Sequence, residues 1–206
     1  VAREDAFVVE RLRAAGAIVL GITNMPPMAA GGMQRGLYGR AESPYNEHYL
    51  TAAFASGSSN GSGTGLAASF AAFALAEETW SSGRAPASNN ALVAYTPSRG
   101  VVSVRGNWPL VPTMDVVVPY ARTMADLFEI LNVIVADDTR ARGDFWRMQQ
   151  AVELPRASSV RPTDYAMLAD PRALAGKRFG VPRMYVNGDP DCARPIATRA
   201  SVIALW

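Results

Sequence analysis

The 206-residue chain contains one histidine, one lysine and one cysteine. A single cysteine excludes a disulfide framework, and together with a single histidine it excludes a cysteine- or histidine-rich metal site. We therefore expect no metal and no other cofactor. Because histidine and lysine are the usual proton acceptors in catalysis, their scarcity also leaves few candidate general bases, namely His48 and Lys177.

The chain has neither a strongly basic segment nor a long apolar run. Its formal net charge is +2 and its arginines are scattered, so we predict that it does not bind nucleic acid. No apolar stretch approaches the roughly 20 residues that a membrane-spanning helix needs. The chain does not begin with Met and has no signal-peptide pattern. Both ends fall inside helical patterns, so we expect a fragment of a longer protein. We also expect the protein to be located in the cytoplasm.

Hydrophobic periodicity predicts a layered α/β domain. Apolar residues recur at helical spacing over residues 5–15, and the helix is predicted to end at Gly16. The apolar run at 17–24 then predicts a buried parallel strand. This helix-glycine-strand order is typical of α/β folds.

Further elements are predicted downstream. Small residues over 62–74 predict a tightly packed helix, followed by a strand at 73–79. A helix is predicted over 123–135, with Thr123 as its N-cap and Asp126 at the third helical position. A last strand is predicted at 177–183.

Seven serines lie between Gly57 and Asn90. Most of them form two clusters at the two ends of the predicted small-residue helix: Ser58, Ser59 and Ser62, and then Ser81 and Ser82. A phosphate-binding loop is disfavoured because no lysine is nearby. The run 57–61 matches G-x-S-x-G, which would make Ser59 the nucleophile of an esterase. That mechanism needs a histidine later in the chain, whereas His48 precedes the motif. A different arrangement, in which a second serine relays the proton of the nucleophile to a neutral lysine, also fits two serine clusters.

The segment from Gly57 to Pro86 resembles the amidase signature sequence, and the resemblance extends along the chain. DAFVVERLRAAGAIVLGITNMP at 5–26 and ALAGKRFGVPR at 173–183 resemble flanking family segments in the same order. The resemblance implies an α/β fold with a mixed β-sheet covered by helices on both faces. It implies one partial domain over 1–206, with a core at 5–136, an irregular surface segment at 137–175, and the start of a further strand and helix segment at 176–206.

The resemblance also assigns roles to individual residues. Ser82 matches the nucleophile that forms the acyl-enzyme, and Ser58 matches a bridging serine on a cis peptide bond. The family's catalytic lysine would lie outside this chain, and Lys177 does not match it. Thr79, Trp80 and Ser81 match residues whose backbone N–H groups bind the oxyanion. Ser59, Arg84 and Glu78 match residues that support the site.

These matches imply an amidase that cleaves a small-molecule amide through a serine acyl-enzyme, with a homodimer as a possible assembly. The alternative is a non-catalytic or amidotransferase-like scaffold protein. Two departures concern the site: Trp80-Ser81 stands where the family has Gly-Gly, and Glu78 stands where it has Asp. With the lysine outside the chain, we expect little activity from the isolated 206 residues.

Overall fold

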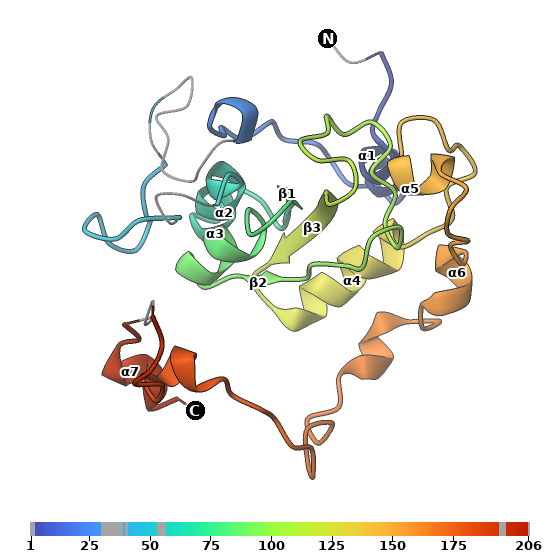
Figure 1. Ribbon diagram of the computed structural model, residues 1–206. Coiled ribbons are helices and arrows are strands. Elements are labelled where there is room, and N and C mark those ends of the chain that lie inside the picture. The colour runs from blue at the N-terminus through green and yellow to red at the C-terminus, as the bar shows by residue number, and fades with distance from the viewer. Residues whose placement is uncertain (1–2, 30–38, 40, 53–56, 194–196, 206) are drawn as a thin grey trace. The chain divides into compact units, whose positions relative to one another are not determined.

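A computed structural model describes residues 3–29, 39, 41–52, 57–193 and 197–205. The chain divides into two compact units, Val1–Ala169 and Asp170–Trp206 (Figure 1). The first unit carries the sheet, the larger helices and both serine clusters. The second contains only two short helices among its described residues, η3 (Arg183–Val186) and α7 (Ala200–Ile203).

The first unit is built on a small antiparallel sheet. Its strands are β1 (Ala74–Glu78), β2 (Val93–Ala94) and β3 (Val116–Ala121), in the order β1-β3-β2. Both neighbours of β3 run antiparallel to it, and Glu78 pairs with Val116 in the register of β1 and β3. All six residues of β3 are buried, so this strand is the centre of the unit.

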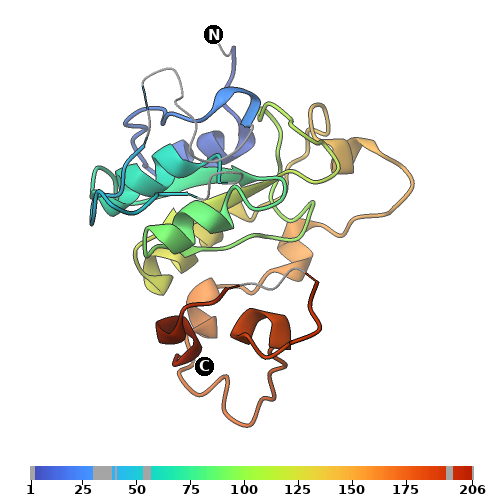
Figure 2. The same cartoon turned by 60° about the vertical axis from the view of Figure 1, so that its left-hand side comes forward.

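Helices cover both faces of this sheet. On one face, α1 (Phe7–Ala14) and α4 (Met124–Ile134) pack against alternate strand residues such as Leu75 and Val117. On the other face, α2 (Asn60–Ala67) and α3 (Arg84–Asn89) lie side by side over Ala76 and Val118 (Figures 1 and 2). The predicted α/β fold with helices on both faces is therefore confirmed, although the strands of the described residues pair antiparallel and do not show the predicted mixed pattern.

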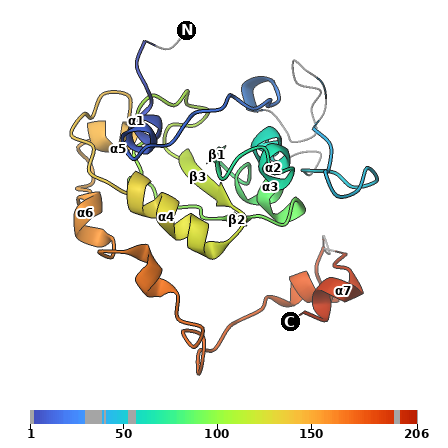
Figure 3. The same ribbon diagram turned by 180° about the vertical axis from the view of Figure 1, so that it is seen from behind.

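The best-marked helix of the sequence forms as predicted. Helix α4 follows β3 directly (Figure 3), and the side chain of Thr123 accepts a hydrogen bond from the Asp126 N–H at its first turn. Its buried residues recur at helical spacing: Leu127, Phe128, Ile130, Leu131 and Ile134. This apolar stripe fixes the side of α4 that faces the sheet.

Two predicted strands are wrong. Residues 17–24 belong to no helix or strand, and Ile18 and Ile22 are 82% and 101% exposed. Residues 177–183 likewise form no strand. A strand is stable only when its backbone pairs with a neighbour, and in the described residues the sheet comprises β1, β2 and β3 alone. Helix α2 also differs from its prediction: it starts at Asn60, ends at Ala67, and is followed by Ser69 at a left-handed φ of 63°.

The segment 137–175 contains only short helices, in keeping with its irregular sequence. Buried Asp144 caps α5 (Phe145–Met148) by accepting from the N–H groups of Trp146 and Arg147. The remaining short helices of this unit are η1 (Pro27–Ala29), α6 (Ala157–Val160) and η2 (Tyr165–Leu168). None of the helices among the described residues has the length and apolar character to cross a membrane.

Candidate active site

The second serine cluster lies in the turn that joins β1 to α3. Residues 79–83 form this turn, and it passes very close to the central strand. A Cβ atom on Gly83 would lie 2.6 Å from Cγ2 of Val118, which is completely buried in β3. Position 83 therefore has to be glycine for Ser82 to lie against the sheet.

One buried carboxylate holds the turn in shape. Oε2 of Glu78 accepts hydrogen bonds from the backbone N–H groups of Gly83 (3.0 Å) and Arg84 (2.7 Å). Oε1 of the same carboxylate pairs with Nε of Arg84 at 2.9 Å, and the Arg84 guanidinium also donates to the Trp80 carbonyl. Glu78, at the end of β1, thus binds the far end of the turn that carries Ser82.

The phenol of Tyr120 supports the turn from the central strand. It donates to the carbonyl of Gly83 and lies 3.4 Å from the carbonyl of Ser82. Burial, with the nearby charge of Glu78 as a lesser cause, raises the pKa of Tyr120 far above its ordinary value. The phenol therefore stays protonated and remains a donor wherever the protein is folded.

The two serine clusters meet at Ser58 and Ser82. The backbone N–H of Ser58 donates to Oγ of Ser82 at 3.2 Å, across 24 positions of sequence. Ser58 is buried, whereas Ser82 is half-buried. The structure thus brings together the two residues that the sequence predicts to share a proton.

The predicted cis peptide bond at Ser58 is not found. All peptide bonds of the described residues are trans, including the one that precedes Ser58. The trans form of a non-proline bond lies roughly 3 kcal/mol lower. The contact between the two serines is made by the main chain of Ser58.

Ser59 and Ser62 attach the start of α2 to the edge of β1. The Ser59 hydroxyl donates to the Glu77 carbonyl (3.1 Å) and accepts from the Glu77 N–H (3.2 Å). The Ser62 hydroxyl donates to the Leu75 carbonyl and lies 2.8 Å from the hydroxyl of Thr23. These hydroxyls take the place of a neighbouring strand, which positions Ser58 next to the turn.

The predicted oxyanion-binding residues Thr79, Trp80 and Ser81 directly precede Ser82 in the turn. Thr79 is buried and its hydroxyl donates to Oδ1 of Asp115 at 2.6 Å. Oδ2 of Asp115 accepts from the N–H groups of Leu110 and Val111, so the loop before β3 is tied to the same point. The Trp80 side chain, by contrast, is 63% exposed.

Glu77 lies on the opposite face of the sheet from Glu78. Burial and the charge of Asp115 raise the pKa of Glu77 to about 7. Its backbone binds Ser59, but its carboxyl group points away from the serines, since successive side chains of a strand face opposite sides.

Sequence reasoning missed three residues of the site: Tyr120, Asp115 and Gly83. Of these, only Asp115 had a visible signal in the sequence, as a carboxylate directly before an apolar run.

Neither candidate base lies in the turn or the serine clusters. His48 is exposed in a separate loop, and Lys177 belongs to the second unit. Among the described residues, no group of three or more His, Cys, Asp or Glu side chains is placed to hold a metal ion.

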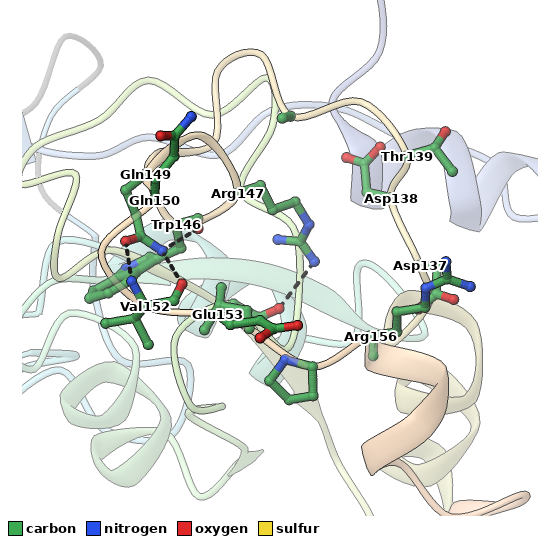
Figure 4. A pocket seen from close by; sticks show the side chains of 15 residues that line it. Asp137, Asp138, Thr139, Trp146, Arg147, Gln149, Gln150, Val152, Glu153 and Arg156 are labelled. Atoms are coloured by element: carbon green, nitrogen blue, oxygen red, sulfur yellow. Dashed lines mark hydrogen bonds between the residues drawn. The ribbon is translucent and has the colours of Figure 1, made fainter.

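The first unit also contains a cavity of about 740 Å³, lined by residues of the segment 137–157 and by Gly100. Its lining includes Asp137, Arg147, Gln149 and Glu153 (Figure 4). The Arg147 guanidinium donates to the Gly100 carbonyl, and the Gln149 amide binds its own loop at Val152. None of the serine-cluster residues lines it, so it is not part of the candidate active site.

Comparison with known proteins connects this arrangement to one family. A family model described as Amidase matches residues 1–200. One component protein of the mitochondrial glutamyl-tRNA(Gln) amidotransferase of Drosophila pseudoobscura pseudoobscura is 38% identical over 188 residues, which cover 88% of this chain and 34% of that protein.

Solved structures agree with this finding. The native peptide amidase of Stenotrophomonas maltophilia has a TM-score of 0.60 and 30% identity, over 75% of this chain and 32% of that one. The crystal structure of PAM12A has a TM-score of 0.66 and 32% identity, over 84% of this chain and 34% of that one. The chain thus spans about a third of the length of the curated relatives it matches.

Proposed function

Because the chain belongs to the amidase family, we propose that it carries the nucleophile of an enzyme that hydrolyses a small-molecule carboxylic amide. The proposal depends on one observation, the hydrogen bond from the Ser58 N–H to Oγ of Ser82. This contact supports the proposal, because the serine that would relay the proton adjoins the serine that would attack. The turn fixed by Glu78 and Tyr120 supports the same assignment, because a nucleophile must be held in one orientation.

The proposed reaction has two stages. Oγ of Ser82 attacks the amide carbonyl, and its proton passes through the Ser58 hydroxyl to a lysine outside this chain. The carbon–nitrogen bond then breaks, the amine leaves with a proton returned by the same route, and an ester to Ser82 remains. Water, deprotonated along that route, attacks the ester, the acyl–oxygen bond breaks, and the acid leaves as the proton returns to Oγ of Ser82. N–H groups of the turn 79–82 would stabilise the oxyanion in both stages.

The alternative nucleophile, Ser59, is less well supported. Its hydroxyl donates to one backbone group of Glu77 and accepts from the other. Attack by Ser59 would require its hydroxyl to give up the hydrogen bond to the Glu77 carbonyl, which would weaken the attachment of α2 to the edge of β1. We therefore assign Ser59, together with Arg84 and Glu78, to the support of the site.

A second candidate function is that of one component of an amidotransferase complex, favoured by relatives named as components of glutamyl-tRNA(Gln) amidotransferase. Both candidates would use Ser82 to open an amide. They differ in assembly: a free-standing amidase would purify alone or as a homodimer, whereas an amidotransferase component would copurify with partners of different sequence. Light scattering of the full-length protein, purified from its source cells, separates these cases.

The nucleophile is tested by substitution in the full-length protein. We expect Ser82→Ala to abolish release of ammonia from simple amides and Ser58→Ala to reduce it at least 100-fold, because proton transfer contributes about that much. Ser88→Ala is a matched control, since Ser88 is an exposed serine of the adjacent α3. A fluorophosphonate should label Ser82. Labelling of Ser59, or full activity of Ser82→Ala, would refute the assignment.

A further inference from the structure

Trp80 is an exposed indole in the turn that carries the proposed nucleophile. It is 63% exposed, although the two residues before it, Glu78 and Thr79, are buried. It lies two positions before Ser82, in the segment whose backbone N–H groups are proposed to face the oxyanion. A large apolar side chain left in water costs hydrophobic free energy, and at this position it is directed away from the protein core.

The backbone on both sides of Trp80 is fixed. Its own carbonyl accepts from Arg84, which is paired with Glu78. The preceding Thr79 is bound through its hydroxyl to buried Asp115. The backbone that carries the indole is therefore held in place, which fixes where the side chain leaves the turn.

We propose that the Trp80 indole forms one wall of the acyl-binding site and selects amides whose carbonyl carries a flat, apolar group such as an aromatic ring. The inference rests on the proposed function of Ser82. A carbonyl that reaches Ser82 and the turn N–H groups has to place its acyl substituent near the side chains of the same turn. An aromatic acyl group can stack on an indole, whereas a small branched aliphatic group covers less of its surface.

The test compares two amides in the full-length protein, benzamide and isobutyramide. We expect the ratio of their kcat/KM values to fall about tenfold in Trp80→Ala, the factor that corresponds to one lost aromatic pair. Trp80→Phe retains an aromatic ring and should retain most of the ratio. Trp108→Ala is the matched control, since Trp108 is 84% exposed but lies outside the turn. An unchanged ratio in Trp80→Ala, or an equal fall in Trp108→Ala, would overturn the inference.

A binding measurement separates this inference from the proposed function. In the Ser82→Ala background, titration calorimetry with benzamide should show about tenfold weaker binding after Trp80→Ala, and no change after Trp108→Ala. Absence of any hydrolysis by the unmodified protein would refute the proposed function alone, because the calorimetric comparison does not need turnover. Equal affinity for benzamide with and without the indole would refute the role of Trp80 alone.

Discussion

Replacement of Glu78 by alanine should both destabilise the protein and disable the turn that carries Ser82. The carboxylate accepts from two backbone N–H groups, those of Gly83 and Arg84, at 3.0 and 2.7 Å. Hydrogen bonds to a charged group contribute about 1.5–3 kcal/mol each. The ion pair with Arg84 adds less than about 1 kcal/mol, because the arginine side chain is 64% exposed.

These contributions sum to roughly 3–7 kcal/mol for Glu78→Ala. Glu78→Gln keeps an oxygen acceptor for the two N–H groups but loses the charge, so it should cost about half as much. The comparison variant is Asp5→Ala, which removes an acidic partner from a pair with Arg13 that is exposed on both sides. That change should cost less than about 1 kcal/mol.

The assay is urea unfolding of the full-length variants, followed by tryptophan fluorescence, together with amide turnover. We expect the order Asp5→Ala, Glu78→Gln, Glu78→Ala in loss of stability. Turnover of Glu78→Ala should fall about 100-fold even without urea, where the variant is folded, because a displaced nucleophile loses its alignment. Equal stabilities of Glu78→Ala and Asp5→Ala would refute the claim that this carboxylate holds the turn.

Three further predictions concern the same unit. Gly83→Ala should cost about 2 kcal/mol, because its Cβ would lie 2.6 Å from Val118, and a double-mutant cycle with Val118→Ala should show strong coupling; additive effects would contradict the packing. The folded state holds the Glu77 proton more tightly than the unfolded state, since the pKa of Glu77 is raised from 4.5 to about 7. The contribution of Glu77 to stability should therefore be fully present below pH 4.5 and be lost, by up to ~3 kcal/mol, as the pH rises through 7. Glu77→Gln should lack this contribution in melting curves, and parallel pH profiles of the two proteins would contradict it. Thr123→Ala should cost about 1 kcal/mol through loss of the α4 cap, and an unchanged Tm would be inconsistent with that cap.

The sequence predicts the parts of the fold whose signals are local. Helix α4 forms where its apolar period and its Thr123 cap place it, and α1 and β1 lie within a residue or two of their predicted bounds. The family resemblance predicts the approach of Ser58 to Ser82, and the structure agrees through a backbone donor. For these helices and this strand, neighbouring residues carry the information, whereas the contact across 24 positions is implied by the resemblance alone.

The missed features depend on residues far apart in the sequence. Strand β3 contains Pro119, which lacks an N–H, and proline argues against a central strand. The apolar run at 17–24 satisfies every local rule for a buried strand yet finds no pairing partner in the sheet of the described residues. Tyr120 reaches Gly83 from 37 positions away, and no sequence period announces such a contact.

The division of adjacent carboxylates between the two faces of the sheet has a practical consequence. Glu78 binds the turn through its side chain, whereas Ser59 contacts only main-chain atoms of Glu77. An engineer can therefore vary the side chain at position 77 to adjust how the protein tolerates alkaline conditions. The contacts of Glu78 and Tyr120 that hold the turn at Ser82 would be left intact, because both side chains lie on the other face of the sheet from Glu77.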